Sequence, residues 1–228
     1  MKRSAVTAFS LVLFGCGGHA AKYKFDDVAL ASVPMTEKQS IFAAEQEVSV
    51  AKAKRQAAEA DVRTTEHDID LARVEREQAR LSTQTAKLEM DAAEKAHDMN
   101  RQGPASDKKR IADLGERVAN AKVDMLDQKR KWQNELIEVG DAQIDAALSR
   151  VEYEKAKLAA AKNIRPTKDF NPEVFTQDFE KRKREVDEEQ READEKKEKL
   201  ERLTQSWKDL DAQYQQARTV PGIAAPTK

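Results

Sequence analysis

Large apolar and aromatic side chains are scarce in this chain of 228 residues. Aromatic residues make up 5% of it, whereas charged residues make up 36%, with 41 basic and 42 acidic side chains. A compact domain of this length needs more bulky apolar residues to fill a broad core. The composition is instead typical of long helices and coiled coils, which bury only a narrow apolar stripe.

Proline and glycine are also few, with 6 and 7 copies, and most of them lie at the borders of long segments with heptad periodicity. Disordered chains are usually richer in both residues and show no sustained period. The formal net charge of -1 leaves no basic excess of the kind that a nucleic-acid binder needs. These features favour a folded helical protein, and we expect no nucleic-acid partner.

Cysteine occurs once, as Cys16. A single thiol excludes both an intrachain disulfide and a cluster of thiolate metal ligands. No run of about eighteen apolar residues exists, so no segment is predicted to cross a bilayer as a helix. The one cysteine nevertheless stands directly after a short apolar run, which points to a role at a membrane.

Residues 1–15 have the features of an export signal. Lys2 and Arg3 supply a positive start, residues 5–14 form an apolar run, and the sequence Leu-Phe-Gly-Cys follows at 13–16. This tetrapeptide resembles the lipobox of bacterial lipoproteins, which has an aliphatic residue three before the cysteine and a small residue directly before it. An ordinary signal peptide followed by an incidental cysteine is the alternative.

The resemblance implies that Cys16 is acylated on sulfur, released from the signal peptide, and acylated again on its new amino terminus with a fatty acid such as palmitate. Two acyl chains suffice for stable anchoring in membrane lipid, whereas one is marginal. Gly17 follows the cysteine. By resemblance to the enterobacterial sorting pattern, this residue implies the outer membrane, with the protein facing the periplasm.

The sequence TEKQ at 36–39 fits a capping box, so we expect a first helix from there to about residue 101. Gly103 and Pro104 predict a break and a tight turn near 102–106, and two long helices joined by a short turn form an antiparallel hairpin. The predicted order is a lipoprotein signal peptide (1–15), a lipidated N-terminus and tether (16–35), the hairpin (36–162), a loop (163–171), a third helix (172–218) and a flexible tail (219–228).

One row of the first predicted helix consists almost wholly of alanine. Every seventh residue from 44 to 93 is alanine, except for a threonine at 65. Small side chains at one core row let two helix backbones approach near the short end of the usual range, about 8 to 10 Å. The pattern predicts a narrow packing seam made of Ala44, Ala51, Ala58, Thr65, Ala72, Ala79, Ala86 and Ala93.

The second arm of the hairpin has apolar residues in heptad phase from Ile111 to Trp132. Leu136, Gly140 and Ile144 then step by four before the heptad phase resumes. Such a stutter unwinds a coiled coil locally, so we predict an irregularity near Gly140.

The third helix is predicted to begin with Asn171 as its cap and Pro172 at its first position. Of the 20 residues from 180 to 199, 17 are charged, which leaves only Val186 and Ala193 to pack. We therefore expect this middle section to be solvated and stabilised by ion pairs four residues apart. A docking surface for a charged partner is the alternative.

Sequence motifs that carry catalysis are missing. There is no phosphate-binding glycine loop, no GxSxG and no pair of histidines four residues apart. Glu94 and His97 form one Glu-x-x-His, whereas a di-iron bundle needs this motif on two helices and two further glutamates. We therefore expect no catalytic residue, no cofactor and no metal site, and we do not expect an enzyme.

Lys228 is the last residue of the sequence. The layout of lipid at one end, coiled coil between and lysine at the other is similar to that of the major outer-membrane lipoprotein of enteric bacteria. That resemblance implies attachment of Lys228 to peptidoglycan. The heptads here follow a different pattern, and a chain that merely ends in lysine is the alternative.

Together these features predict an all-α protein, an elongated antiparallel coiled-coil hairpin of two long helices plus a third long, highly charged helix. We expect a membrane-anchored envelope lipoprotein that acts as a structural spacer, scaffold or partner-binding coiled coil. Its helix faces would contact other envelope proteins or copies of itself. A periplasmic holdase-type chaperone, or an accessory hairpin of an efflux or secretion system, is the alternative.

Overall fold

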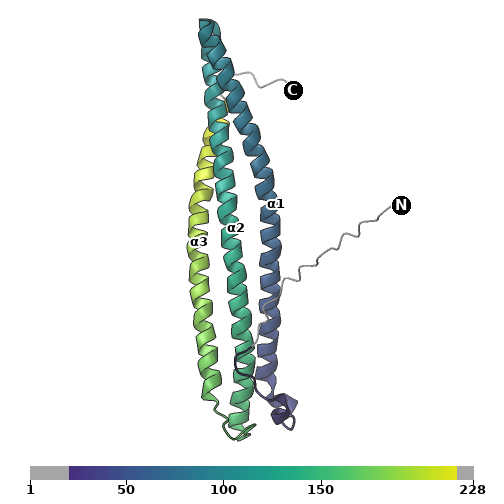
Figure 1. Cartoon of the computed structure of the whole chain (residues 1–228). Helices are drawn as coiled ribbons and strands as arrows, with labels where there is room; N and C mark the ends of the chain where they lie inside the picture. The colour runs from purple at the N-terminus through teal and green to yellow at the C-terminus, as the bar shows by residue number, and fades with distance from the viewer. Residues whose placement is uncertain (1–20, 220–228) are drawn as a thin grey trace, which may run out of the picture.

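The computed structural model describes residues 21–219, and all regular structure in that range is helical. Three long α-helices run side by side and form a rod (Figure 1), which confirms the all-α fold with an elongated hairpin and a third long helix. No helix in this range has both the length and the apolar character needed to cross a bilayer. The elements are the 3-10 helices η1 (Asp27–Leu30) and η2 (Met35–Glu37) and the α-helices α1 (Gln39–Lys95), α2 (Met99–Ala161) and α3 (Glu173–Thr219).

Helix α2 lies in the middle of the rod, with α1 on one side and α3 on the other (Figure 1). Both outer helices pack against α2, whereas no Cα atom of α1 comes within 8 Å of a Cα atom of α3. The three helices therefore form a layer and not a closed bundle. In such a layer the middle helix buries two faces, and each outer helix keeps a face free.

The predicted alanine seam is the contact face of α1 on α2. Seven of its eight members are buried, and Ala79 is half-buried. Ala72 is fully buried in a cluster with Ile69 of the same helix and with Val123 and Leu126 of α2. The prediction of a packing seam made of small side chains is confirmed.

Ion pairs between α1 and α2 follow the same register along the whole hairpin. A glutamate of α1 meets a basic residue of α2 near each end and in the middle, with N···O distances of 2.5 to 2.6 Å. Because the register does not slip, neither helix has an extra residue inserted between these points. The pairs are Glu47–Arg150, Glu75–Lys122 and Glu89–Lys108.

The predicted stutter near Gly140 is wrong, because α2 has two seams instead of one. Gly140 faces Arg55 of α1, while the side chain of Gln128 donates to the carbonyl of Lys196 in α3. Apolar positions from 111 to 132 share the heptad phase of the α3 seam, and those from 140 onward share that of the α1 seam. The step of four at Leu136, Gly140 and Ile144 therefore marks where the apolar residues pass from the α3 seam to the α1 seam. Both seams are themselves uninterrupted.

The predicted turn near 102–106 is also wrong, because α2 already begins at Met99 and runs on through Gly103 and Pro104. Pro104 is exposed and lies in the second turn of the helix, where its missing N–H removes a single hydrogen bond. Gly103 is exposed as well, and no atom beyond its own helical turn and its two chain neighbours lies within 4 Å of the place of an added Cβ. Packing of α2 on α1 outweighs this local cost.

The chain reverses instead at residues 96–98. His97 adopts a left-handed backbone conformation with a φ of 52°, and the N–H groups of His97 and Asp98 donate to the carbonyls of Glu94 and Ala93 at the end of α1. The Asp98 side chain then caps α2 by accepting hydrogen bonds from the N–H groups two and three residues on. A Schellman-type helix end is thus followed directly by a capped helix start.

Helix α3 begins as predicted, with the Asn171 side chain accepting from the N–H of Glu173 at 2.9 Å. Contrary to the prediction, its charged middle section packs on α2 and is not solvated all round. Ala193 is fully buried there, and Lys196 pairs with the buried carboxylate of Glu135. A small residue at the contact lets α3 approach, so that long charged side chains reach across to α2.

Residues 21–38 pack on one end of the rod, so the prediction of a tether up to residue 35 is wrong for this part. Phe25, Leu30 and Val33 are buried against the start of α1, the end of α2 and the start of α3. The predicted capping box is not formed either, because η2 occupies that segment and α1 has no side-chain cap.

The two ends of the rod are named as follows. The base is the end formed by residues 21–38 and the helix ends that they cover, and the tip is the turn at 96–98.

Candidate functional site

The two modification sites predicted from the sequence, Cys16 and Lys228, lie outside residues 21–219, and their modification stays a prediction. Of the single Glu-x-x-His pattern, His97 is exposed in the turn at the tip and Glu94 is exposed at the end of α1. The left-handed backbone of His97 gives this residue a structural part in the turn.

A groove runs over α2 between the two outer helices. Its floor contains Ala146 and Ala147 of α2, and its sides include Val50 of α1 together with Phe179 and Val186 of α3. Charged side chains of all three helices line the rest of the groove. An apolar floor with charged rims suits an elongated surface of another protein better than a small substrate.

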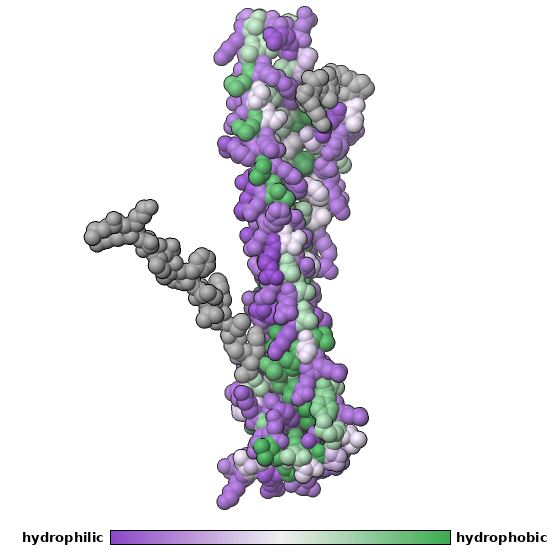
Figure 2. Space-filling model, turned by 90° about the vertical axis from the view of Figure 1, so that its right-hand side faces the viewer, coloured by the Kyte–Doolittle hydropathy of each residue, from purple (hydrophilic) through white to green (hydrophobic). Residues whose placement is uncertain are grey.

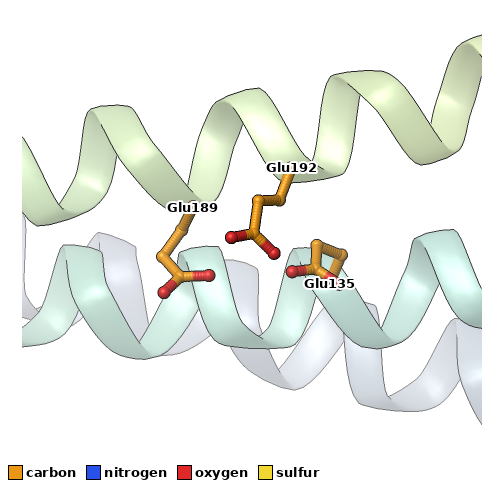
Figure 3. A group of neighbouring side chains, drawn as sticks. All are labelled: Glu135, Glu189 and Glu192. Atoms are coloured by element: carbon orange, nitrogen blue, oxygen red, sulfur yellow. The ribbon is translucent and has the colours of Figure 1, made fainter.

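Three glutamates meet where the charged section of α3 lies on α2 (Figure 3). Glu135 comes from α2 and Glu189 and Glu192 from α3, and a carboxylate oxygen of each lies within 4.8 Å of the others. Glu135 is 7% exposed and pairs with the ammonium group of Lys196. Carboxylate oxygens suit Ca²⁺ or Mg²⁺, but one of these three already has a cationic partner. We therefore assign the cluster to the packing of α3 on α2.

The charges in this cluster are not fully balanced. Partial burial raises the pKa of Glu189, and the negative charges of Glu192, Glu138 and Glu188 raise it further. A raised pKa in the folded state means that the ionised carboxylate is held at a cost. That cost is absent below the ordinary glutamate pKa, grows between the ordinary and the raised pKa, and is fully present above the raised pKa.

Replacing Glu189 with glutamine is expected to raise the thermal midpoint of unfolding at about pH 7 and to leave it unchanged at about pH 3, where glutamates are protonated. Circular dichroism at the two pH values measures both midpoints. The matched control is Glu201→Gln, at an exposed glutamate of the same helix, which should have no pH-dependent effect. A loss of stability in Glu189→Gln at neutral pH would show that the carboxylate stabilises the fold.

Lys155 connects the segment 21–38 to the end of α2. Its side chain is 12% exposed, and its ammonium group lies 2.7 Å from Asp27 and 3.1 Å from Glu152. Glu152 also accepts a hydrogen bond from the N–H of Phe25 at 2.5 Å. Burial alone lowers the pKa of Lys155, but the two carboxylates outweigh it, so the pKa is raised. The stabilisation is present below the ordinary lysine pKa and is lost only in strongly alkaline solution.

The free face of α1 carries an uncharged stripe, which we call the outer stripe. Fifteen positions from residue 43 to residue 92 follow each other at spacings of three and four, and every one of them is exposed. None of the 19 charged residues in this span falls on these positions. Figure 2 looks onto the α1 edge and shows pale and green side chains running along the rod between purple borders. The outer stripe consists of Ala43, Gln46, Val50, Ala53, Ala57, Ala60, Thr64, His67, Leu71, Val74, Gln78, Leu81, Thr85, Leu88 and Ala92.

The outer stripe and the glutamate cluster were not predicted from the sequence, for different reasons. The stripe has a signal in the sequence, because its spacing is that of a coiled-coil core and charge is absent from it. Finding it requires a search for two heptad frames in one helix. The glutamate cluster has no such signal, because glutamate is common in α3 and only the register of α3 on α2 brings these three together.

Comparison with protein-family models, with curated proteins and with solved structures finds no match for this chain. Its function is therefore inferred from its own residues and geometry.

Proposed function

We propose that this chain is a lipid-anchored rod of the bacterial envelope, held in the outer membrane by an acylated Cys16 and facing the periplasm. The observation that carries the proposal is the sequence Leu-Phe-Gly-Cys at 13–16, directly after a basic and apolar leader. In this role the rod acts as a spacer or scaffold and binds partners through helix faces, without catalysis.

The packing of the base supports a rod held close to its anchor. Residues 21–38 are docked on the helix ends, so only residues 17–20 lie between Cys16 and the docked segment. The five steps from Cys16 to Ala21 span at most about 17 Å. An acylated Cys16 thus keeps the base near the bilayer, and the docked segment transmits that position to all three helices.

The dimensions of the helices support a spacer or scaffold. Helix α2 has 63 residues and is about 95 Å long. The large apolar cluster lies at the base, while the rest of the rod is built from narrow seams and surface ion pairs. A partner bound along α1 or α3 is therefore presented at a distance from the anchor that depends on its position on the rod.

The anchor is tested by Cys16→Ser in the producing bacterium. Because acylation of the thiol precedes cleavage in lipoproteins of this kind, we expect an uncleaved precursor that takes up no fatty-acid label. The matched control, Gly18→Ser, keeps the thiol and should be labelled as the unmutated chain is. Labelling that persists in Cys16→Ser, or its absence from the unmutated chain, would rule out the anchor.

A further inference from the structure

The outer stripe has the form of a coiled-coil core without its second helix. Large apolar side chains stand on it at heptad spacing, among them Val74, Leu81 and Leu88, which are 58%, 52% and 69% exposed. With the two rows of residues that flank it, the stripe offers about thirty residues, as many as one side of a standard stable interface. Spacings of three and four require an occupant that is itself a helix with the same period.

The outer stripe also continues an arrangement that the rod already uses twice. Helix α3 joins α2 along one heptad seam, and α2 joins α1 along another. The outer stripe of α1 is a third seam of the same kind at the edge of the layer. The opposite edge is different, because α3 has one seam of packing residues, made of two rows, and charged residues over most of its remaining surface.

We infer that the outer stripe is a homodimer interface, in which α1 of one chain pairs with α1 of a second copy, parallel and in register. Within residues 21–219, α2 uses both of its seams and α3 has no uncharged second stripe, so the free stripe that matches α1 is that of another α1. The same surface on both chains gives a two-fold symmetric, closed contact.

Charges beside the outer stripe favour the parallel arrangement. On the side nearer α2 the flanking row has one lysine, Lys54, and is otherwise mainly acidic. It includes Asp61 and Asp68, and also Glu47, Glu75 and Glu89, which pair with basic residues of α2. In an antiparallel pair this row meets itself, so like charges face each other. In a parallel pair it meets the row on the other side of the stripe.

That second row is mixed and contains several uncharged residues. Parallel pairing in register brings Asp68 opposite Arg63 of the second copy, Asp61 opposite Gln56, and Glu89 opposite Gln84, by the usual offset of five residues. The same offset brings Asp70 opposite Glu75, but each of these carboxylates pairs with a basic residue of its own chain, Arg73 and Lys122. Both copies then have their bases at the same end. This matches two chains anchored in one membrane, although the dimer does not depend on the anchor.

The test uses the full chain with Cys16→Ser, so that each added thiol is the only one. Ala53→Cys and Leu88→Cys lie 35 residues apart on the outer stripe, about 52 Å along the helix. A parallel dimer in register brings each position next to its own copy, so both variants should form disulfide-linked dimers on mild oxidation. An antiparallel dimer cannot do this at both positions.

Two controls accompany the disulfide test. Arg73→Cys is exposed on α1 but lies off the stripe, so it should remain unlinked. Leu81→Lys places a charge on the stripe and should convert the dimer to a monomer in sedimentation equilibrium, with an unchanged circular dichroism spectrum because Leu81 is exposed in the single chain. A chain that sediments as a monomer throughout the micromolar range, or that links at only one of the two positions, would overturn the inference.

Discussion

Ala72→Leu is expected to destabilise the rod by about 1 to 3 kcal/mol, the usual cost of overpacking a filled core. Ala72 is fully buried between Ile69 and the α2 residues Val123 and Leu126, so three added carbons have no room. Leucine and alanine differ little in helix propensity, and the loss must therefore arise at the α1–α2 contact. Thermal unfolding followed by circular dichroism measures it.

The control for this prediction is Ala53→Leu on the same helix. Ala53 is exposed on the outer stripe, so a leucine there meets no atom of its own chain that it must displace. Its midpoint should equal or exceed that of the unmutated chain, because a larger apolar residue on the stripe adds contact area to a dimer. Equal losses of stability in the two variants would mean that the alanine row is not the packing seam.

Gly140→Leu is expected to push α1 away from α2 where Gly140 lies against Arg55. A Cβ at Gly140 would lie 2.9 Å from the Cβ of Arg55 and 3.2 Å from its Cα, and a backbone atom cannot swing aside as a side chain can. The adjacent ion pair between Arg55 and Asp141 would be strained as well. We expect a loss of about 1 to 3 kcal/mol, in spite of the better helix propensity of leucine.

Gly103→Leu is the matched control, since it makes the same change in the same helix. An added Cβ at Gly103 meets no atom within 4 Å apart from those of the adjacent residues and its own helical turn, but Pro104 follows it, and a residue with a Cβ before proline is disfavoured in the helical conformation. This strain offsets the gain in helix propensity of up to about 1 kcal/mol, so we expect little net change in stability. Denaturant unfolding at one temperature compares the two variants directly, and an equally small change in Gly140→Leu would show that α1 and α2 do not approach closely at Gly140.

Helix type, helix length and the α1 seam could be predicted from the sequence, because they depend on local periodicity and on residue size. The alanine row is the clearest case, since a small residue at every seventh position has one simple consequence for packing. The start of α3 was predicted for a similar reason, because Asn171 and Pro172 act within one turn of the helix.

The features that the sequence did not reveal depend on contacts between distant segments. Pro104 predicts a break in the helix, but its cost to helix stability is small here, because it removes one hydrogen bond near an exposed helix end. The sequence predicts Phe25 to be part of a tether, because its burial depends on the ends of three helices that pack around it. The charged section of α3 around Ala193 is predicted to be solvated until α2 is placed beside it, where Glu135 pairs with Lys196. Cys16 and Lys228, outside the described residues, remain predictions from sequence alone.

The extended rod is the claim on which the spacer, the free face of α1 and the dimer all depend, and small-angle X-ray scattering tests it most directly. The monomeric Leu81→Lys variant is suitable, because its single chain gives the simplest curve. A rod as long as α2, about 95 Å, has a radius of gyration of at least about 27 Å. A compact fold of 228 residues has one near 17 Å. We predict the larger value, and a value near 17 Å would contradict the account.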